Sequence, residues 1–79
     1  MLGETGDARV IPHLLSLLRK DAVAGVRSEA AFRLGKVGDE SGLADLAAVA
    51  EADSDLVVRG WARWAMQQIK QSHESGSGR

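Results

Sequence analysis

The side chains that usually carry out chemistry are few in this 79-residue chain. It has two histidines, His13 and His73, and no cysteine or tyrosine. Apart from a lone Glu74 beside His73, no second metal ligand stands near either histidine. The segment Gly35-Lys36-Val37-Gly38 lacks the Gly-Lys-Ser/Thr ending of a phosphate-binding loop. We therefore predict no catalytic residue, no metal and no cofactor.

The three aromatic residues are the more informative group. Trp61 and Trp64 are three residues apart, so they share one face of a helix. Phe32 occupies the position equivalent to Trp64 in an internal repeat, so stacking the two units places these rings side by side. Grouped aromatic side chains are enriched in binding hot spots, and neighbouring arginines suit an acidic protein or a cation–π contact. We predict a partner-binding surface made by Phe32, Arg33, Trp61, Arg63 and Trp64.

Two other interpretations of these side chains stay open. The tryptophans could instead fill the end of the helical stack, against Met66 and Gln68. The arginines could belong to an ordinary solvated face, because the acidic residues Glu29, Asp45, Glu51, Asp53 and Asp55 dilute the positive charge. That dilution also argues against nucleic acid, where aromatic rings would stack on bases and arginines would meet phosphates.

The sequence repeats itself at an interval of thirty-two residues. A fixed interval of this size is typical of stacked solenoid units. The matched segments are Leu34–Asp39 with Leu2–Asp7, and Val58–Ala62 with Val26–Ala30. A stacked pair of units is therefore favoured over an ordinary up-down four-helix bundle, which remains the alternative.

Apolar residues at helical spacing predict four helices, over residues 8–20, 26–36, 41–52 and 56–71. Asp7 is a good N-cap for the first helix, and Pro12 fits its early turns. Gly35 and Gly38 supply the permissive backbone that ends the second helix and reverses the chain. The apolar face of the first helix comprises Val10, Ile11, Leu14, Leu15, Leu17 and Leu18.

These helices make two αα-hairpins within one domain. Repeat one covers about residues 7–36, repeat two about 39–71, and the domain covers 1–71. Residues 72–79 are polar and rich in Gly and Ser, so we predict a disordered tail.

Composition limits the class of protein. About 44% of residues are apolar and few are aromatic, which suits close packing of helices better than a β-sandwich. A net charge of −1 argues against a nucleic-acid or anionic-membrane footprint. No apolar run approaches the roughly 20 residues that span a bilayer, and no secretory signal is present. We expect a cytoplasmic protein.

The stretch Val26–Asp39 (VRSEAAFRLGKVGD) resembles the HEAT repeat, in its short phycobilisome-lyase or E–Z type. That pattern is approximately V-R-x-x-A-A-x-A-L-G-x-[LI]-G-D, and Arg33 replaces a usual Ala. Val10–Leu15 is similar to the start of the first helix of such a repeat, and the resemblance covers about residues 2–69. It implies an all-α αα-hairpin solenoid fragment of two HEAT-like repeats, with Phe32, Trp61 and Trp64 on the concave surface of the second helices.

The same resemblance implies a structural ladder of aspartates and arginines. Asp21 and Asp53 would lie in the turns within each repeat, and Arg27 and Arg59 at the start of the following helices. Hydrogen bonds between them would tie each turn to the next helix and to the neighbouring repeat.

The chain departs from the family pattern at both ends. It opens with the end of a second helix. Its last helix is bulkier and more polar than the equivalent helix of repeat one. Glu29, Ala31, Phe32 and Gly35 of repeat one are replaced there by Trp61, Arg63, Trp64 and Gln67, in that order. Such a helix is typical of a solenoid terminus, and two repeats are fewer than the three or so that usually bury a continuous core. We expect either a fragment of a longer array or a homo-oligomer, most simply a two-fold dimer.

These features favour a non-catalytic module that binds a protein partner through the surface of the second helices. The alternative implied by the resemblance is an accessory subunit or fragment of a bilin lyase-like protein, holding a tetrapyrrole or phycobiliprotein. A third reading is a linker segment of a larger protein.

Overall fold

The chain is described by a computed structural model that covers the backbone of residues 10–78 and the side chains of residues 10–72. Its elements are α1 (Val10–Lys20), α2 (Ala24–Val37), the short 3₁₀ helix η1 (Glu40–Gly42), α3 (Leu43–Ala52) and α4 (Leu56–Gly78). No strand occurs in this range, so the predicted all-α class is confirmed. The predicted cap Asp7 and the first two residues of the predicted first helix lie outside it.

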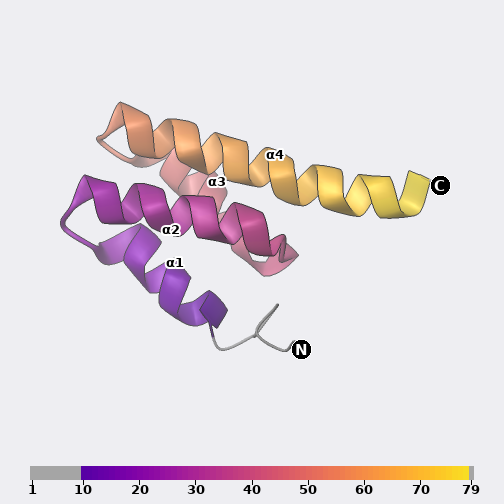
Figure 1. Cartoon of the computed structure of the whole chain (residues 1–79). Helices are drawn as coiled ribbons and strands as arrows, with labels where there is room; N and C mark the ends of the chain where they lie inside the picture. The colour runs from indigo at the N-terminus through magenta and orange to yellow at the C-terminus, as the bar shows by residue number, and fades with distance from the viewer. Residues whose placement is uncertain (1–9, 79) are drawn as a thin grey trace.

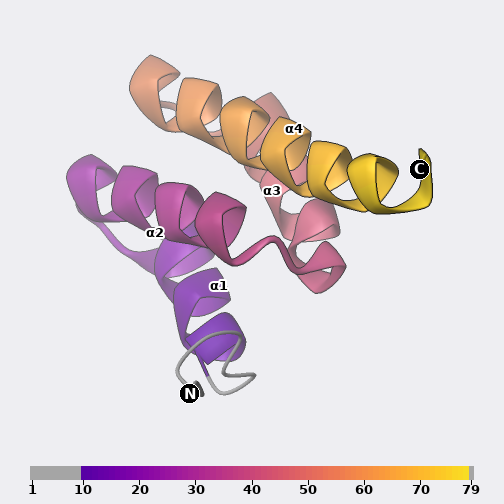
Figure 2. The same cartoon turned by 45° about the vertical axis from the view of Figure 1, so that its right-hand side comes forward.

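The helices pair as two αα-hairpins, α1 with α2 and α3 with α4 (Figure 1). The most extensive contact between elements joins α2 to α4, so the second helices of the two hairpins lie side by side. Figure 2 shows the same pairing from a second direction. In this view α2 and α4 form one layer, and α1 and α3 lie behind it. This is the stacked arrangement that the thirty-two-residue repeat predicts.

Aliphatic and alanine side chains from all four helices form the core. Its most deeply buried large members are Leu18, Leu34, Leu46, Val58 and Ile69. Burying a side chain of this size contributes about 1.5–3 kcal/mol, so five such positions carry much of the driving force for folding. Val10, predicted to lie on the buried face of α1, is exposed because it stands at the first turn, beyond the cover of the second hairpin.

α2 and α4 are in close contact at Gly35. A Cβ atom built there would lie 2.8 Å from Cζ3 of Trp64 and 2.9 Å from Cα of Ala65. Such distances leave no room for a side chain, so only glycine permits this approach. Gly35 was predicted to help end the helix, and that interpretation is wrong: it lies inside α2, where it serves packing.

The chain reversal after α2 takes place at Gly38, as predicted. Its φ of 76° lies in the left-handed region that favours glycine, and its N–H donates to the carbonyl oxygen of Leu34 at 3.1 Å. The next residue, Asp39, accepts a hydrogen bond from the N–H of Ser41 at 2.8 Å and starts η1. The two hairpins are therefore joined by a short turn that these hydrogen bonds hold in place.

Three helix boundaries differ from the prediction by two residues or more, the first being the start of α2, at Ala24 and not at Val26. Residues predicted as the start of the third helix form η1 before α3 begins at Leu43. The last helix was predicted to end at about Gln71, before a disordered tail over 72–79, whereas α4 continues to Gly78. Once a helix is established, each added residue gains a hydrogen bond, so polar residues without proline can continue it. No helix within the described part of the chain is both long and apolar enough to cross a bilayer.

The close approach predicts opposite effects of adding one methyl group at two glycines. Gly35→Ala should destabilise the fold by roughly 1–3 kcal/mol, because the backbone of α4 must move away. Gly60→Ala should stabilise it by about 0.5–1 kcal/mol, because nothing lies within 4 Å of the new Cβ and alanine favours a helix. Chemical denaturation followed by circular dichroism measures both. Equal effects of the two substitutions would contradict the packing role of Gly35.

Candidate functional site

The three aromatic side chains form one cluster across α2 and α4. The ring of Phe32 stacks on Trp64, with centroids 5.6 Å apart and an interplanar angle of 15°. Trp61 meets both of the other rings edge to face, at 5.6 Å from Phe32 and 5.4 Å from Trp64. Such pairs contribute about 0.5–1.5 kcal/mol beyond their burial. The internal repeat predicted that Phe32 and Trp64 are neighbours, and they are.

The two tryptophans differ in their surroundings. Trp64 is half-buried and lies over Gly35, so it belongs to the contact between α2 and α4. Trp61 is 38% exposed and stands beside a shallow groove of about 380 Å³ whose lining also includes Val57 and Gly60. We call Phe32, Val57, Trp61 and Trp64 the aromatic patch. Trp64 thus packs within the stack, and Trp61 is presented to solvent.

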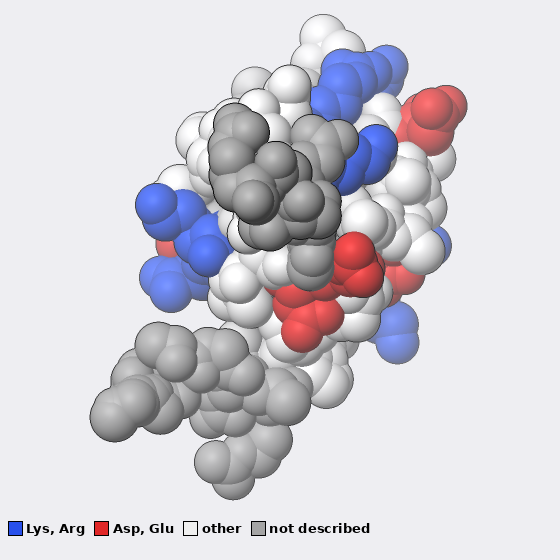
Figure 3. Space-filling view, turned by 90° about the vertical axis from the view of Figure 1, so that its right-hand side faces the viewer, with Lys and Arg blue, Asp and Glu red and all other residues white. Residues whose placement is uncertain are grey.

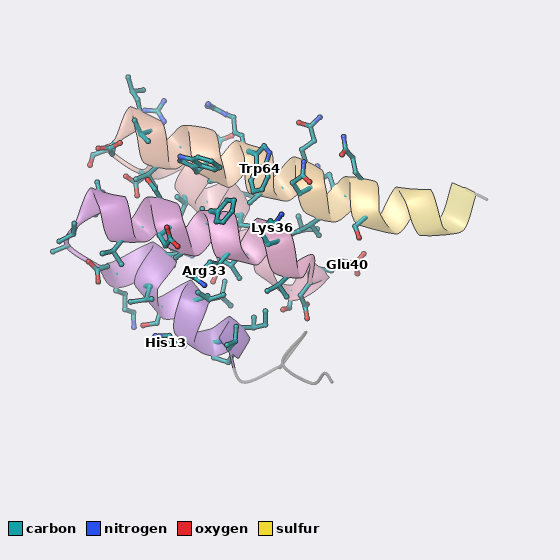
Figure 4. All side chains as sticks on the ribbon, viewed as in Figure 1. His13, Arg33, Lys36, Glu40 and Trp64 are labelled. Carbon is teal, nitrogen blue, oxygen red and sulfur yellow. The ribbon has the colours of Figure 1, made fainter. Side chains whose placement is uncertain are left out.

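Of the two arginines predicted to border the aromatic patch, Arg33 lines a hollow together with Phe32, and neither lines the shallow groove next to Trp61. Arg33 donates from Nε to Oε2 of Glu29 at 2.9 Å, and it lies between the ribbons of α1 and α2 (Figure 4). Arg63 is exposed and makes no ion pair within residues 10–72. The cation beside the rings is Lys36, whose Nζ lies 5.9 Å from the centroid of Phe32. Its spacing of four residues from Phe32 is the signal that could have identified it.

The aspartate and arginine residues implied by the family resemblance meet in one place. Arg27 donates from Nε to Oδ2 of Asp53 at 2.8 Å and from Nη2 to Oδ1 at 3.0 Å. A third bond runs from its Nη1 to the backbone carbonyl of Asp21 at 2.9 Å. One guanidinium therefore joins the turn of its own hairpin to the turn of the next.

This ion pair is shielded from water, and it changes the pKa of both side chains. The side chains of Arg27 and Asp53 are 14% and 8% exposed. The hydrogen bonds from Arg27 lower the pKa of the Asp53 carboxyl below its ordinary value, against the opposing effect of burial. The bond to Asp53 in turn raises the pKa of the Arg27 guanidinium. The contact is a bidentate, charge-assisted pair, which is the strongest kind.

The other two members of the expected ladder have different roles. The carboxylate of Asp21 accepts the N–H of Val23 at 2.9 Å and shapes its own turn. Arg59 does not extend the ladder: its Nε is buried and has no hydrogen-bond partner among the described residues. Its charge still helps to lower the pKa of Asp53.

Residues 10–72 contain no group of three or more His, Cys, Asp and Glu side chains that could hold a metal ion. His13 is exposed on α1, and the side chains of His73 and Glu74 lie outside the described residues. The face in Figure 3 carries acidic and basic side chains in separate small groups with uncharged surface between them. That face thus offers no continuous basic surface of the kind that binds a nucleic-acid backbone.

Comparison with known proteins gives one match. A family model described as HEAT repeats matches residues 1–67. No curated protein and no solved structure matches the chain.

The shielded ion pair predicts a pH-dependent stability. Asp53→Asn should lower the thermal midpoint at pH 7 by roughly 5–10 °C, because it removes a charged partner of Arg27. The folded-state pKa of Asp53 is depressed, so its contribution is present above the unfolded pKa of about 3.9 and is lost as the pH falls through the folded pKa. The difference between variant and wild type should therefore close below about pH 4.

The matched control is Asp45→Asn. Asp45 accepts a bond from Arg19 across the same sequence separation at 3.2 Å, but these side chains are 33% and 45% exposed. Exposed pairs contribute little, so its midpoint should stay within about 3 °C of wild type. Melting curves from pH 2.5 to 8 measure both variants. A loss that is equal for the two, or unchanged at low pH, would contradict this account of Asp53.

Proposed function

Because this chain belongs to the HEAT repeat family, we propose that it is a non-catalytic module that binds a protein partner through the aromatic patch. HEAT repeats commonly mediate protein–protein interaction. The observation that carries the proposal is the patch itself: three rings in mutual contact, one of them well exposed, on two helices that touch at Gly35.

The mechanism is presentation of a preformed surface. Trp64 is fixed by its stacking on Phe32 and by its position over Gly35, so little side-chain freedom is left to lose on binding. Trp61 then offers an apolar anchor of the type found at the centre of interfaces. Lys36 supplies a charge at the rim, where it favours an acidic group on the partner.

Self-association through the same surface is part of the proposal. Leu56 and Val57, at the start of α4, are 75% and 61% exposed, and Trp61 follows one turn later. Contiguous exposed apolar side chains of this kind mark interaction sites. In the absence of another partner, two copies related by a two-fold axis would cover this area with the same patch on each. The cytoplasmic location expected from the sequence remains a prediction.

The tetrapyrrole alternative has less support. It requires arginines beside the aromatic rings to hold the carboxylates, and within residues 10–72 no arginine lines the groove next to Trp61. A change in the visible absorbance of a bilin on adding the purified protein would revive this alternative.

Size-exclusion chromatography with light scattering tests the proposal on three forms of the chain. Wild type should have the mass of a dimer at high concentration. Trp61→Ala should be monomeric with unchanged helicity, because Trp61 packs at the surface. The control Val23→Ala removes an exposed apolar side chain from the turn between α1 and α2 and should leave the dimer intact.

A second measurement separates the two parts of the proposal. Wild type that stays monomeric up to about 1 mM would contradict self-association by a standard-size interface. Partner capture that is lost in Trp61→Ala but kept in Val23→Ala would then still support a protein-binding patch. Equal capture by all three forms would contradict the role of the patch.

A further inference from the structure

A second groove lies between α1 and α2, on the other side of α2 from α4. Its volume is about 460 Å³, compared with about 380 Å³ for the groove beside Trp61. Its floor is aliphatic and is formed by Val10, Leu14 and Leu17 of α1 with Val37 of α2. It shares only Phe32 with the aromatic patch, so it is a separate surface. We call it the α1–α2 groove.

The internal repeat shows what kind of surface this is. The residues equivalent to Leu14, Leu17, Arg33 and Val37 in the second hairpin are Leu46, Val49, Ala65 and Ile69. All four of these are buried in the core between the hairpins. The groove is thus the first hairpin's copy of a surface that, in the second hairpin, is covered by helices. Its floor is apolar, as a site for the apolar face of a helix requires.

One substitution between the repeats changes what can bind. Ala65 lies against Gly35, close enough for the backbones of α4 and α2 to touch. At the equivalent position the first hairpin has Arg33, whose side chain prevents so close an approach. A helix in the groove must stand farther from α2, and it must face a guanidinium in place of a methyl group.

The rim of the groove carries positive charge that the described residues neutralise only in part. Arg33 donates only from Nε, to the exposed Glu29, which leaves both terminal nitrogens without a partner in the described part of the chain. Lys36 makes no ion pair there, and its only recorded contact is with the ring of Phe32. His13 lines the groove from α1, and no acidic residue among residues 10–72 lines it. Figure 4 shows Arg33 between the two ribbons, and Lys36 on the side of α2 nearer Trp64.

A second copy of this chain does not fit the groove. The outer side of α4 carries Arg59, Arg63 and Gln67, at the positions of Arg27, Ala31 and Gly35 on α2. Stacking a second copy by the geometry of the two hairpins would put Gln67 against Arg33, where the two hairpins have Gly35 against Ala65. Two long polar side chains would then replace a glycine and an alanine, which disfavours head-to-tail assembly of copies.

We propose that the α1–α2 groove binds an amphipathic helix of a partner protein whose apolar face is flanked by acidic residues. Apolar side chains of that helix lie on Val10, Leu14, Leu17 and Val37. Its carboxylates meet the terminal nitrogens of Arg33 and Nζ of Lys36. This is the helix-in-groove mode of recognition, with specificity set by charge. The inference does not rest on the aromatic patch, and the groove would bind whether or not the patch dimerises the chain.

The test uses the full chain and two synthetic peptides of about 15 residues. One has Leu at positions i, i+3, i+4 and i+7 with Glu at the flanking positions, and the other has Lys in place of every Glu. Titration followed by ¹⁵N chemical shifts should place the acidic peptide at Val10, Leu17 and Val37, and leave the indole N–H of Trp61 unmoved. The basic peptide should not bind, and affinity for the acidic one should fall as salt rises.

Two double variants with the same change in net charge separate this site from general attraction. Arg33→Gln/Lys36→Gln should weaken binding of the acidic peptide by about tenfold or more. Arg63→Gln/Lys70→Gln, on α4 outside the groove, should change it by less than about twofold. Circular dichroism checks that both variants keep their helicity.

Four results would overturn the proposal. The acidic peptide could fail to bind, or its contacts could map to Trp61 in place of the groove. The two double variants could weaken binding equally. Finally, Glu4→Gln/Asp7→Gln could bind the peptide several-fold more tightly than wild type, which would show that the chain's own N-terminal segment is the occupant. None of these results depends on the oligomeric state that tests the aromatic patch.

Discussion

The contact of α2 with α4 at Gly35 is the constraint on which the other features depend. With no side chain at this position, the backbone of α2 reaches the side chain of Trp64 and the backbone of Ala65. That approach brings Phe32 within stacking distance of Trp64, and it brings the first turn of α2 to the turn before α4. The aromatic patch and the buried ion pair are thus two consequences of one close helix contact. A bulkier residue at Gly35 would disturb both at once.

Arg27 fixes the angle and register of α2 relative to α4, which the contact at Gly35 alone does not determine. Small residues set how closely two helices approach, but they do not prevent sliding along the axes. The guanidinium holds the carbonyl of Asp21 and the carboxylate of Asp53 together, so the turns of both hairpins stay at the same level. Asp53 also accepts the N–H of Asp55, whose own carboxylate caps α4 through the N–H groups of Val57 and Val58. The start of α4 is therefore positioned by a continuous set of hydrogen bonds.

The repeat and the apolar spacing were sufficient to predict the number of helices, their pairing and the contact of Phe32 with Trp64. They were sufficient because these features follow from period and burial, which a sequence displays directly. The direction of Arg33 and the role of Lys36 were not predicted, because a long side chain can reach either flank of a helix and its choice depends on nearby charges such as Glu29. The role of Gly35 was also misread. A glycine near the end of a helix has the same signature whether it ends the helix or admits a neighbour.

The two proposed surfaces lie where the hairpins stop repeating each other. Positions that agree in kind, such as Leu14 with Leu46 or Ala30 with Ala62, are buried and build the stack. Positions that disagree are exposed on at least one side: Trp61 stands where repeat one has Glu29, and Arg33 where repeat two has Ala65. The core needs the same small and aliphatic residues in each unit, so agreement is explained by packing. Disagreement at a surface position is not required by packing, and here it supplies an apolar anchor on α4 and a cation beside an aliphatic groove on α2. In this pair of repeats, the differences between the units therefore point to the surfaces where we propose that partners bind.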